Sequence, residues 1–148
     1  MLNEIVAHND LKIRVHEGFF TAFEGNELLS KFIEALPWES MKIKMFGREV
    51  LIPRLQCWVG DDGCDYSYSG HKLNRQPWTS ELLMIKEKIS LQTNLEFNSV
   101  LVNYYRDGQD SMGWHTDDER ELGKNPTIAA LSFGSERDLV FKNILSKE

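Results

Sequence analysis

The feature that most constrains this chain is a change in hydrophobic period near residue 99. Before that point, apolar residues recur at helical spacing in two segments, 26–36 and 79–91. From Ser99 onward, short β-prone runs separated by turns replace the helical pattern. Apolar residues at i, i+3 and i+4 favour a helix, whereas β-branched and aromatic runs between turns favour strands. The sequence therefore predicts an α+β protein whose strands form a sandwich or barrel.

Local signals predict where each element begins and ends. Asn26 can cap the first helix and Pro37 stops it, while Thr79 or Ser80 can open the second, which ends near Leu91. Strands are expected within 41–59 (around residues 46–47 and 53), at 66–68, and over 99–105, 127–133 and 139–141.

The composition is that of an ordinary soluble globular protein. The chain has 148 residues, 41% hydrophobic and 27% charged, enough for one domain with a core. It contains no apolar run long enough to span a membrane and no signal-peptide pattern at its N-terminus. We therefore expect a monomer without a membrane partner, cytoplasmic or, in a eukaryote, nuclear.

The two cysteines, Cys57 and Cys64, are too few for a disulfide framework, so free thiols are expected. A zinc site made of Cys57, Cys64 and His71 is an alternative, although zinc sites usually carry closer cysteine pairs and a fourth ligand.

Charge is unevenly distributed along the chain. The net charge of −6 argues against binding nucleic acid by bulk electrostatics alone. Residues 40–56 nevertheless hold four basic residues against one acidic, and residues 107–121 hold six acidic against one basic. Such a basic strip suits an anionic polymer and such an acidic region suits a cation; ordinary solvated charge is the alternative.

The segment 114–118 contains the pattern His115-x-Asp117. In a strand, residues i and i+2 share one face, so the imidazole and the carboxylate would project together. They would supply two of the three ligands of the facial triad of non-heme Fe(II) oxygenases. Asn103 and Tyr105 would share a face in the same way, in an arrangement suited to a dicarboxylate. A surface histidine beside acids, and a strand end emerging into solvent, are the alternatives.

Several ordered motifs together resemble the AlkB family of DNA dealkylases. They extend from about Met45 to Lys142, roughly two-thirds of the chain. In order, they are Pro53-Arg54, Tyr66-Ser67-Tyr68-Ser69-Gly70, Gln76-Pro77-Trp78, Asn103-Tyr104-Tyr105-x-Asp107-Gly108, the segment from Gly113 to Glu119, Ala130-Leu131-Ser132-Phe133-Gly134, and Arg137-Asp138-Leu139-Val140-Phe141.

This resemblance implies a double-stranded β-helix (jelly roll) with the N-terminal helices packed on it. It implies a single domain over 1–148, with a substrate-recognition part over about 1–95 and the jelly-roll core over about 96–148. The implied activity is DNA repair by an Fe(II)- and 2-oxoglutarate-dependent dioxygenase. Such an enzyme consumes O2 and removes the methyl group of 1-methyladenine or 3-methylcytosine as formaldehyde; alkylated DNA, or RNA, is its partner.

The resemblance also assigns roles by position. His115 and Asp117 would bind iron, and Asn103 and Tyr105 would bind 2-oxoglutarate. Residues implied in substrate binding are Phe46, Gly47, Arg54, Tyr66, Tyr68, Asp118 and Glu119. The two tyrosines would stack on a flipped base, the two acids would face its positive charge, and Arg54 would meet phosphate. Met45-Phe46-Gly47 resembles a finger that fills the gap left by the flipped base; the alternative is a hairpin phenylalanine packing on the core.

The chain departs from the family pattern after Lys142. The family carries a second histidine and further arginines downstream, but none of the four histidines here follows His115. We therefore expect a C-terminally truncated form whose last strands are missing. A fragment, a short relative without catalysis, and a chain completed by a partner all fit this pattern.

Other functional readings stay open. One is a non-catalytic relative that binds nucleic acid, and another is a hydroxylase acting on RNA or protein. Calcium binding by the acids of residues 107–119 lacks the usual order of ligands.

Overall fold

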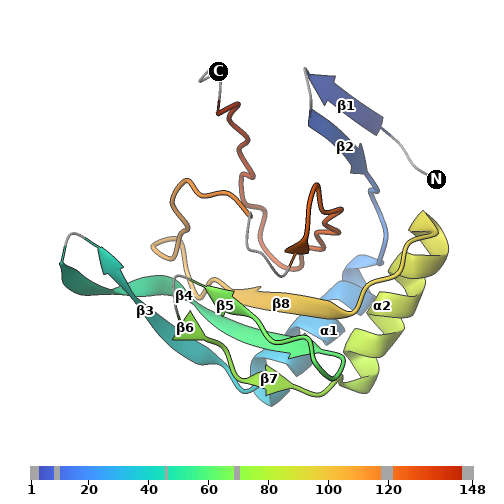
Figure 1. Ribbon diagram of the computed structural model, residues 1–148. Coiled ribbons are helices and arrows are strands. Elements are labelled where there is room, and N and C mark those ends of the chain that lie inside the picture. Colours follow the sequence, from blue (N-terminus) through green and yellow to red (C-terminus); the bar gives the residue numbers. More distant parts are fainter. Residues whose placement is uncertain (1–3, 9–10, 46, 69–70, 118–121, 145–148) are drawn as a thin grey trace. The chain divides into compact units, whose positions relative to one another are not determined.

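The computed structural model describes residues 4–8, 11–45, 47–68, 71–117 and 122–144 (Figure 1). Its contacts divide the chain into two compact units, one of Met1–Phe32 with Leu131–Glu148, the other of Ile33–Ala130. The boundary falls within helix α1 (Ala22–Ala35). The single domain expected over 1–148 stays a prediction.

The larger unit is built on a mixed four-stranded sheet (Figure 1). Its strands are β3 (Glu39–Met45), β4 (Arg48–Gly60), β7 (Arg75–Gln76) and β8 (Ser99–Tyr104). The long strand β4 pairs antiparallel with both β3 and β8 and parallel with β7. Because β4 pairs with all the others, its side chains dominate the interior of this unit.

Strand β4 continues through Pro53, where only short strands were expected. Ser40 of β3 pairs with Leu55, but Lys42 pairs with Leu51, so three residues of β4 lie opposite one of β3. Proline has no N–H to donate and is tolerated in sheets at such irregularities. The Pro53 carbonyl instead accepts a hydrogen bond from the Ser111 amide at 3.0 Å, which ties a later loop to the strand.

Helix α1 begins earlier than the expected Asn26 cap. The Thr21 amide donates to Glu24 Oε2 at 2.8 Å, and the Glu24 amide donates to Thr21 Oγ1 at 3.2 Å. This reciprocal pair is a capping box, a stronger start signal than a lone asparagine. The helix ends at Ala35, just before the predicted stop at Pro37.

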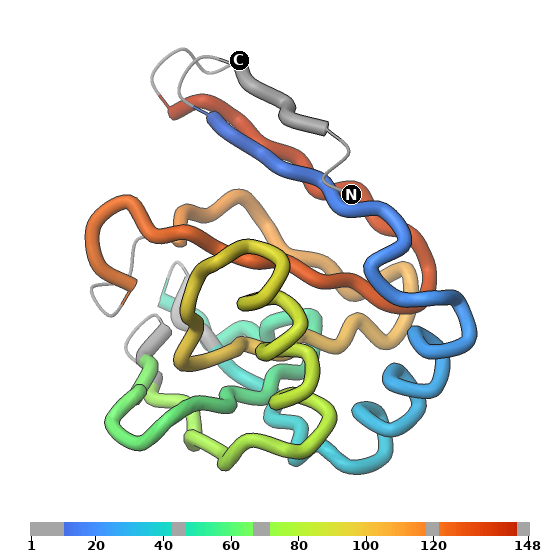
Figure 2. The backbone as a smooth tube through the Cα atoms, turned by 90° about the vertical axis from the view of Figure 1, so that its right-hand side faces the viewer, coloured from blue at the N-terminus to red at the C-terminus, as the bar shows by residue number. Residues whose placement is uncertain are grey.

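Helix α2 (Ser80–Thr93) confirms the second predicted helix. The Thr79 hydroxyl caps it by accepting from the Leu82 amide, and Asn94 ends it in the left-handed conformation with φ of 57°. Figure 2 shows α2 in yellow. Its Leu82, Ile85 and Ile89 line an apolar pocket of about 60 Å³ at the start of β8. Ligand sites are usually several times larger, so we assign this pocket no ligand.

An apolar cluster forms on the sheet face that carries Trp58. Its buried members are Met41, Ile52, Trp58, Tyr66 and Leu73. The rings of Trp58 and Tyr66 stack at 4.5 Å between centroids, and the Trp58 indole donates to the Cys64 carbonyl at 2.7 Å.

Two short hairpins complete the described strands. Strands β5 (Ser67–Tyr68) and β6 (His71–Lys72) pair antiparallel and confirm the predicted β-prone segment. Strands β1 (Glu4–His8) and β2 (Leu11–Val15) form an N-terminal hairpin that was not expected. The expectation that the first helix precedes every strand is therefore wrong.

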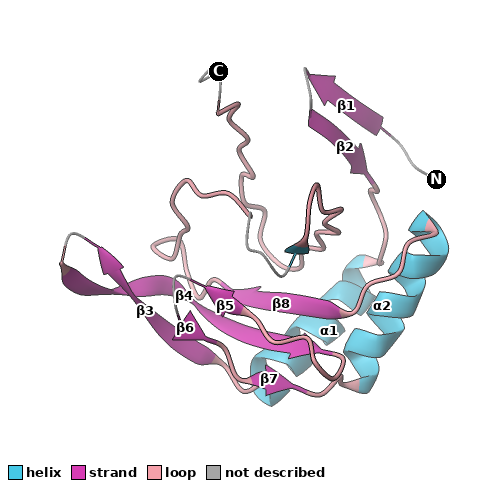
Figure 3. Ribbon diagram, viewed as in Figure 1, coloured by secondary structure: helices cyan, strands magenta, loops and turns pink. Residues whose placement is uncertain are grey.

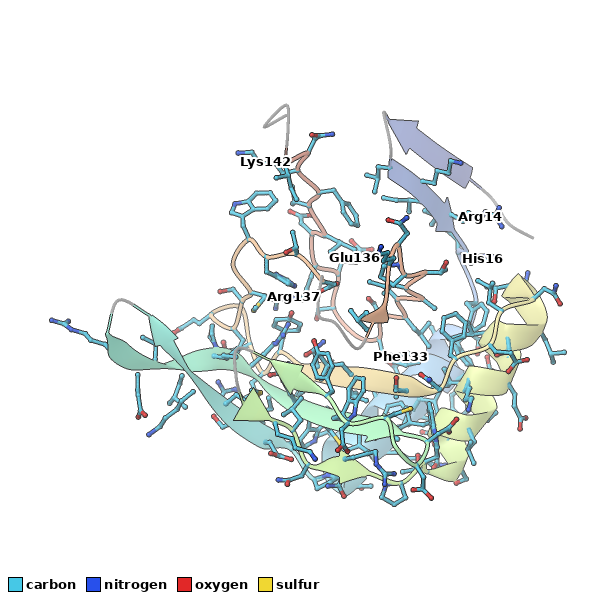
Figure 4. The ribbon with its side chains drawn as sticks, in the orientation of Figure 1. Arg14, His16, Phe133, Glu136, Arg137 and Lys142 are labelled. Carbon is cyan, nitrogen blue, oxygen red and sulfur yellow. The ribbon has the colours of Figure 1, made fainter. Side chains whose placement is uncertain are left out.

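The strands predicted over 127–133 and 139–141 are also wrong, because the described chain from 123 to 144 contains no regular element (Figure 3). Phe133 instead packs within the smaller unit, with its ring centroid 5.8 Å from that of Phe20 and 6.3 Å from that of Phe32 (Figure 4). The α+β class is confirmed, while the double-stranded β-helix stays a prediction.

Candidate functional site

His115 and Asp117 lie together, although not on a strand. The chain from 105 to 117 is irregular, so the strand argument that linked them was wrong. His115 Nε2 nevertheless lies 3.3 Å from Asp117 Oδ1, and both side chains are partly exposed. Neighbouring ligands of an octahedral ion, each about 2.1 Å from it, lie about 3 Å apart. The separation therefore suits two ligands of one metal ion.

A backbone contact orients the histidine ring. His115 Nδ1 lies 2.9 Å from the Gly113 carbonyl, so a proton on Nδ1 would be donated there. That tautomer leaves the Nε2 lone pair on the side of Asp117, as in metal sites where a second hydrogen bond fixes the ligand histidine.

The loop that leads from β8 to His115 is held by a buried carboxylate. Asp110 is 5% exposed and accepts from the Arg106 amide at 2.9 Å and from its guanidinium at 2.7 and 2.8 Å. The hydrogen bonds and charge of Asp110 raise the pKa of Arg106. Asp107 closes the turn by accepting from the Gln109 amide at 2.8 Å. Sequence analysis did not predict these contacts between Arg106 and Asp110, which we call the Arg106–Asp110 clasp. Acidic residues at 107 and 110, on either side of a glycine, were nevertheless a signal for a turn.

Four polar side chains form a cross-strand cluster on β4 and at the end of β8. We call Arg54, Gln56, Asn103 and Tyr105 the polar quartet. Gln56 and Asn103 are direct partners in the register, with 3.1 Å between Gln56 Nε2 and Asn103 Oδ1. Arg54 Nη1 donates to the Tyr105 hydroxyl at 3.2 Å. Asn103 and Tyr105 were predicted as a pair, but Gln56 was missed because nothing in its sequence context marks it.

The side-chain amide of Gln56 also lies beside the guanidinium of Arg54. If the oxygen and nitrogen of this amide are exchanged, the oxygen replaces Nε2 as the atom 3.1 Å from Asn103 and accepts from Arg54 Nη2 at 2.9 Å and from Arg54 Nε at 3.3 Å. This orientation matches donors to acceptors. Gln56 is 1% exposed and Arg54 is 5% exposed, whereas Asn103 is exposed and Tyr105 half-buried. The quartet is thus buried on the β4 side and open on the β8 side.

Apolar residues flank the quartet on the same sheet face. Alternate residues of a strand share a face, which places Ile52 and Trp58 at the two ends of the Arg54–Gln56 pair. Leu101, the register partner of Trp58, packs against the apolar cluster. The quartet is therefore a polar patch set in an apolar surface, as in many ligand sites.

The residues expected to bind substrate are described in part. Phe46, Asp118 and Glu119 lie outside the described residues. Gly47 has φ of +77° in the connection between Met45 and Arg48, which are register partners. A two-residue hairpin loop favours glycine at such an angle.

The two tyrosines expected in the base pocket lie close together in the chain. Tyr66 is buried against Trp58, and Tyr68 lies in β5 as the register partner of His71.

In the basic strip of residues 40–56, the exposed Lys42 forms an ion pair with Glu49, with 3.6 Å between Nζ and Oε2.

The zinc alternative gains no support from the described residues. Cys57 and Cys64 are free thiols, as expected. Burial, with a smaller effect of Glu39, raises the pKa of Cys57 to about 11, which disfavours the thiolate a metal requires. Within the described ranges, no three His, Cys, Asp or Glu side chains gather around a common point.

The helices that the structure describes are all too short or too polar to cross a membrane.

Comparisons with known proteins identify the family of the chain. Residues 12–147 match the model of the 2OG-Fe(II) oxygenase superfamily. The chain is 42% identical over 115 residues to the DNA oxidative demethylase ALKBH2 of Bos taurus, and 41% identical over the same length to that of Homo sapiens. It is 38% identical over 130 residues to the alpha-ketoglutarate-dependent dioxygenase alkB homolog 3 of Rattus norvegicus.

These alignments cover 78%, 78% and 85% of this chain but 41%, 44% and 42% of the respective relatives. The chain therefore spans less than half the length of the curated relatives it matches. The matched range, residues 12–147, spans both the His115–Asp117 pair and the polar quartet. The chain belongs to the 2OG-Fe(II) oxygenase superfamily and, within it, to the AlkB family.

Proposed function

We propose that this chain carries part or all of an Fe(II)- and 2-oxoglutarate-dependent dioxygenase that removes methyl groups from alkylated DNA bases. The observation that carries the proposal is the 3.3 Å approach of His115 Nε2 to Asp117 Oδ1. The relatives, a DNA oxidative demethylase and an alpha-ketoglutarate-dependent dioxygenase, support the same reaction.

Iron would be held by His115 and Asp117. One imidazole and one carboxylate suit Fe(II), and the remaining coordination positions stay available to other ligands. Bound iron and 2-oxoglutarate would together use O2 to oxidise the methyl group, which is chemistry that no side chain supplies. The Gly113 carbonyl would keep the proton on His115 Nδ1. The contacts of Arg106 with Asp110 would fix the turn of the loop, and the Ser111 amide would hold the loop on Pro53 of β4.

The co-substrate 2-oxoglutarate would lie on Asn103 and Tyr105. An amide and a phenol can both donate to a carboxylate, and both are accessible from the open side of the quartet. The complete framework we propose is a double-stranded β-helix within one domain, with the recognition part over about 1–95 and the core over about 96–148.

The DNA would meet residues on either side of that site. Tyr68 would lie along the flipped base, whereas Tyr66, stacked on Trp58 in the core, would contribute to the pocket only from beneath its surface. Asp118 and Glu119 would complement the positive charge of 1-methyladenine or 3-methylcytosine. Gly47 allows the tight hairpin that would present Phe46 to the duplex. A cytoplasmic or nuclear location and a monomeric state are part of the proposal.

Turnover of a methylated oligonucleotide tests the function. The chain, supplied with Fe(II) and 2-oxoglutarate, should release succinate and formaldehyde from an oligonucleotide carrying 1-methyladenine. His115→Ala should abolish both products, and an unmethylated oligonucleotide should yield no formaldehyde. Binding of methylated DNA without either product would refute catalysis and favour the non-catalytic relative. A methylated RNA competitor that is processed faster than DNA would refute the DNA assignment.

A further inference from the structure

Trp114 differs from the other three tryptophans of the chain in its exposure. It is 70% exposed, whereas Trp58 is buried and Trp38 and Trp78 are half-buried. Each of these three donates its indole N–H to a carbonyl or carboxylate oxygen at 2.7 to 3.2 Å and so helps to hold the fold. Tryptophan is enriched in binding interfaces, where its large ring contributes more than most side chains. The exposed indole of Trp114 is therefore available to a partner from outside the chain.

The backbone next to Trp114 is fixed to the larger unit. The Asp110 carboxylate is hydrogen-bonded to Arg106, and the Ser111 amide donates to a carbonyl of β4 at 3.0 Å. Met112 packs against the apolar cluster. An aromatic side chain on such a fixed loop loses little conformational freedom when a ligand contacts it. The fold thus presents the ring for binding at a low entropic cost.

The place of Trp114 in the chain sets it beside the metal-binding pair. It directly precedes His115, so the two Cα atoms are about 3.8 Å apart, and His115 Nε2 lies 3.3 Å from Asp117 Oδ1. Under the proposed function, the methyl group to be oxidised must lie at these two side chains. Successive bases of a stacked strand are about 3.4 Å apart, so the nucleotides on either side of the methylated one pass close to residue 114.

A neighbouring base suits this ring better than a phosphate does. When the methylated base leaves the stack, one face of each neighbouring base loses its cover. An indole can cover such a face, and this contact tolerates any sequence because every base has a π-face. A phosphate would instead need a cation, and residues 107–117 contain three aspartates and no lysine or arginine. Stacking requires no such charge.

We infer that Trp114 stacks on a base next to the methylated one and thereby helps to hold the substrate strand. The inference rests on the proposed function, which brings methylated DNA to His115 and Asp117. The contact lies outside the pocket proposed for the methylated base itself. Unlike the role predicted for Phe46, it does not depend on a second DNA strand.

Binding of single-stranded oligonucleotides tests this contact without relying on turnover. The oligonucleotide carries one 1-methyladenine, and Mn(II) replaces Fe(II) so that no oxidation begins. In Trp114→Ala, the dissociation constant should rise about tenfold, because one base loses its stacking partner. Trp114→Phe keeps an aromatic ring and should stay within about threefold of the wild type. Fluorescence anisotropy of a labelled oligonucleotide measures these constants.

Abasic nucleotides identify which part of the strand the ring contacts. Two further oligonucleotides lack the base on the 5′ side or on the 3′ side of 1-methyladenine. With one of them, the wild type and Trp114→Ala should bind equally well, because the stacking partner is already absent.

Tryptophan emission supplies a second readout. Binding of the intact oligonucleotide should quench the emission of the wild type more than that of Trp114→Phe, whose remaining tryptophans are buried or half-buried.

A matched control and a stability measurement separate binding from structure. Phe23→Ala removes another exposed aromatic ring, at a residue that is 75% exposed, and should bind the oligonucleotide like the wild type. Trp114→Ala should unfold at the wild-type temperature, because substitutions at exposed positions usually change stability little.

Three results would overturn the inference. Equal affinity of the wild type and Trp114→Ala for the intact oligonucleotide would refute it and leave the proposed function standing. A loss that persisted with both abasic oligonucleotides would do the same, since the ring would then contact another part of the strand. No binding of methylated DNA by the wild type would refute both the inference and the proposed function. If Trp114→Ala does not fold, the emission decides, because equal quenching in the wild type and Trp114→Phe would exclude stacking by the indole.

Discussion

The position of Cys57 in β4 changes the pKa of its thiol. The residue is buried in the strand and its pKa is raised to about 11, first by burial and then by the charge of Glu39. The folded state therefore retains the thiol proton at a pH where the unfolded chain, with an ordinary thiol pKa near 9, has lost it.

We predict that the free energy of unfolding falls as pH rises from about 9 to about 11. In this interval the unfolded state binds fewer protons than the folded state at Cys57, so stability falls with pH. Below pH 9 the contribution of Cys57 to the free energy of unfolding is fully present. By pH 11 and above, the free energy of unfolding has fallen by at most about 3 kcal/mol. Urea unfolding at several pH values measures the slope.

Two variants isolate the thiol in that experiment. Cys57→Ala should show a shallower slope than the wild type between pH 9 and 11, whereas Cys64→Ala should keep the wild-type slope. Identical slopes in the wild type and Cys57→Ala would mean that the thiol of Cys57 is not protected by the fold.

At position 46, we predict a substrate-dependent loss of activity. Phe46→Ala should reduce demethylation of double-stranded DNA about tenfold more than that of single-stranded DNA, because only the duplex leaves a gap to fill when a base flips. Parallel rates on the two substrates measure the ratio, and Met45→Ala is the neighbouring control. An equal loss on both would indicate a packing role for the phenylalanine.

Residue roles could be predicted from sequence only where a short motif carried them. His115 and Asp117 were paired by an argument from strand geometry that proved wrong, yet a loop held by Asp110 brings them together. Gln56 could not be found, because its importance comes from its register partner Asn103, 47 residues later. Cross-strand partners depend on register, which no local pattern specifies here.

Among the elements, the loop from β8 to His115 keeps its conformation through the carboxylate of Asp110. We predict that Asp110→Asn lowers the free energy of unfolding by about 1–3 kcal/mol, because hydrogen bonds to the charged Arg106 are weakened in a buried place. It should also weaken metal binding at His115, since the loop that carries the histidine loses its anchor. Urea unfolding and Mn(II) titration measure the two effects.

Asp138→Asn is the matched control for that loop, since it removes an exposed carboxylate from another part of the chain. It should leave both quantities unchanged. Unaltered metal affinity in Asp110→Asn would mean that the clasp stabilises the fold without positioning the histidine.

The elements were predicted well where their signals are local. Helix α2 follows from Thr79 and an apolar periodicity, and β8 from its β-branched run. The capping box of α1 was present in the sequence but was overlooked in favour of Asn26. The segment 127–133 has the composition of a strand but forms none, because a strand needs a partner to accept its hydrogen bonds.

At the scale of the whole molecule, the contacts form two units, and Phe133 stabilises the smaller one. We predict that Phe133→Ala increases amide hydrogen exchange in the first two turns of α1 and leaves exchange in β4 unchanged. Removing a partly buried aromatic ring costs about 1–3 kcal/mol, and its described ring contacts, Phe20 and Phe32, lie within this unit.

Phe141→Ala is the control for that experiment, since Phe141 is an exposed phenylalanine in the same segment. Exchange that increased equally in α1 and β4 after Phe133→Ala would mean that the two units unfold together. The division into units was not predicted, because the contacts that create it join the two ends of the sequence.

The register between β4 and β8 has a consequence for how the polar quartet is assembled. Moving β8 by one residue would turn Asn103 and Tyr105 to the opposite face of the sheet. A dicarboxylate that binds the quartet would thus recognise one strand alignment and ignore its neighbours. Because a ligand stabilises only the conformation that binds it, a dicarboxylate bound at the quartet would stabilise molecules with this strand alignment and no others.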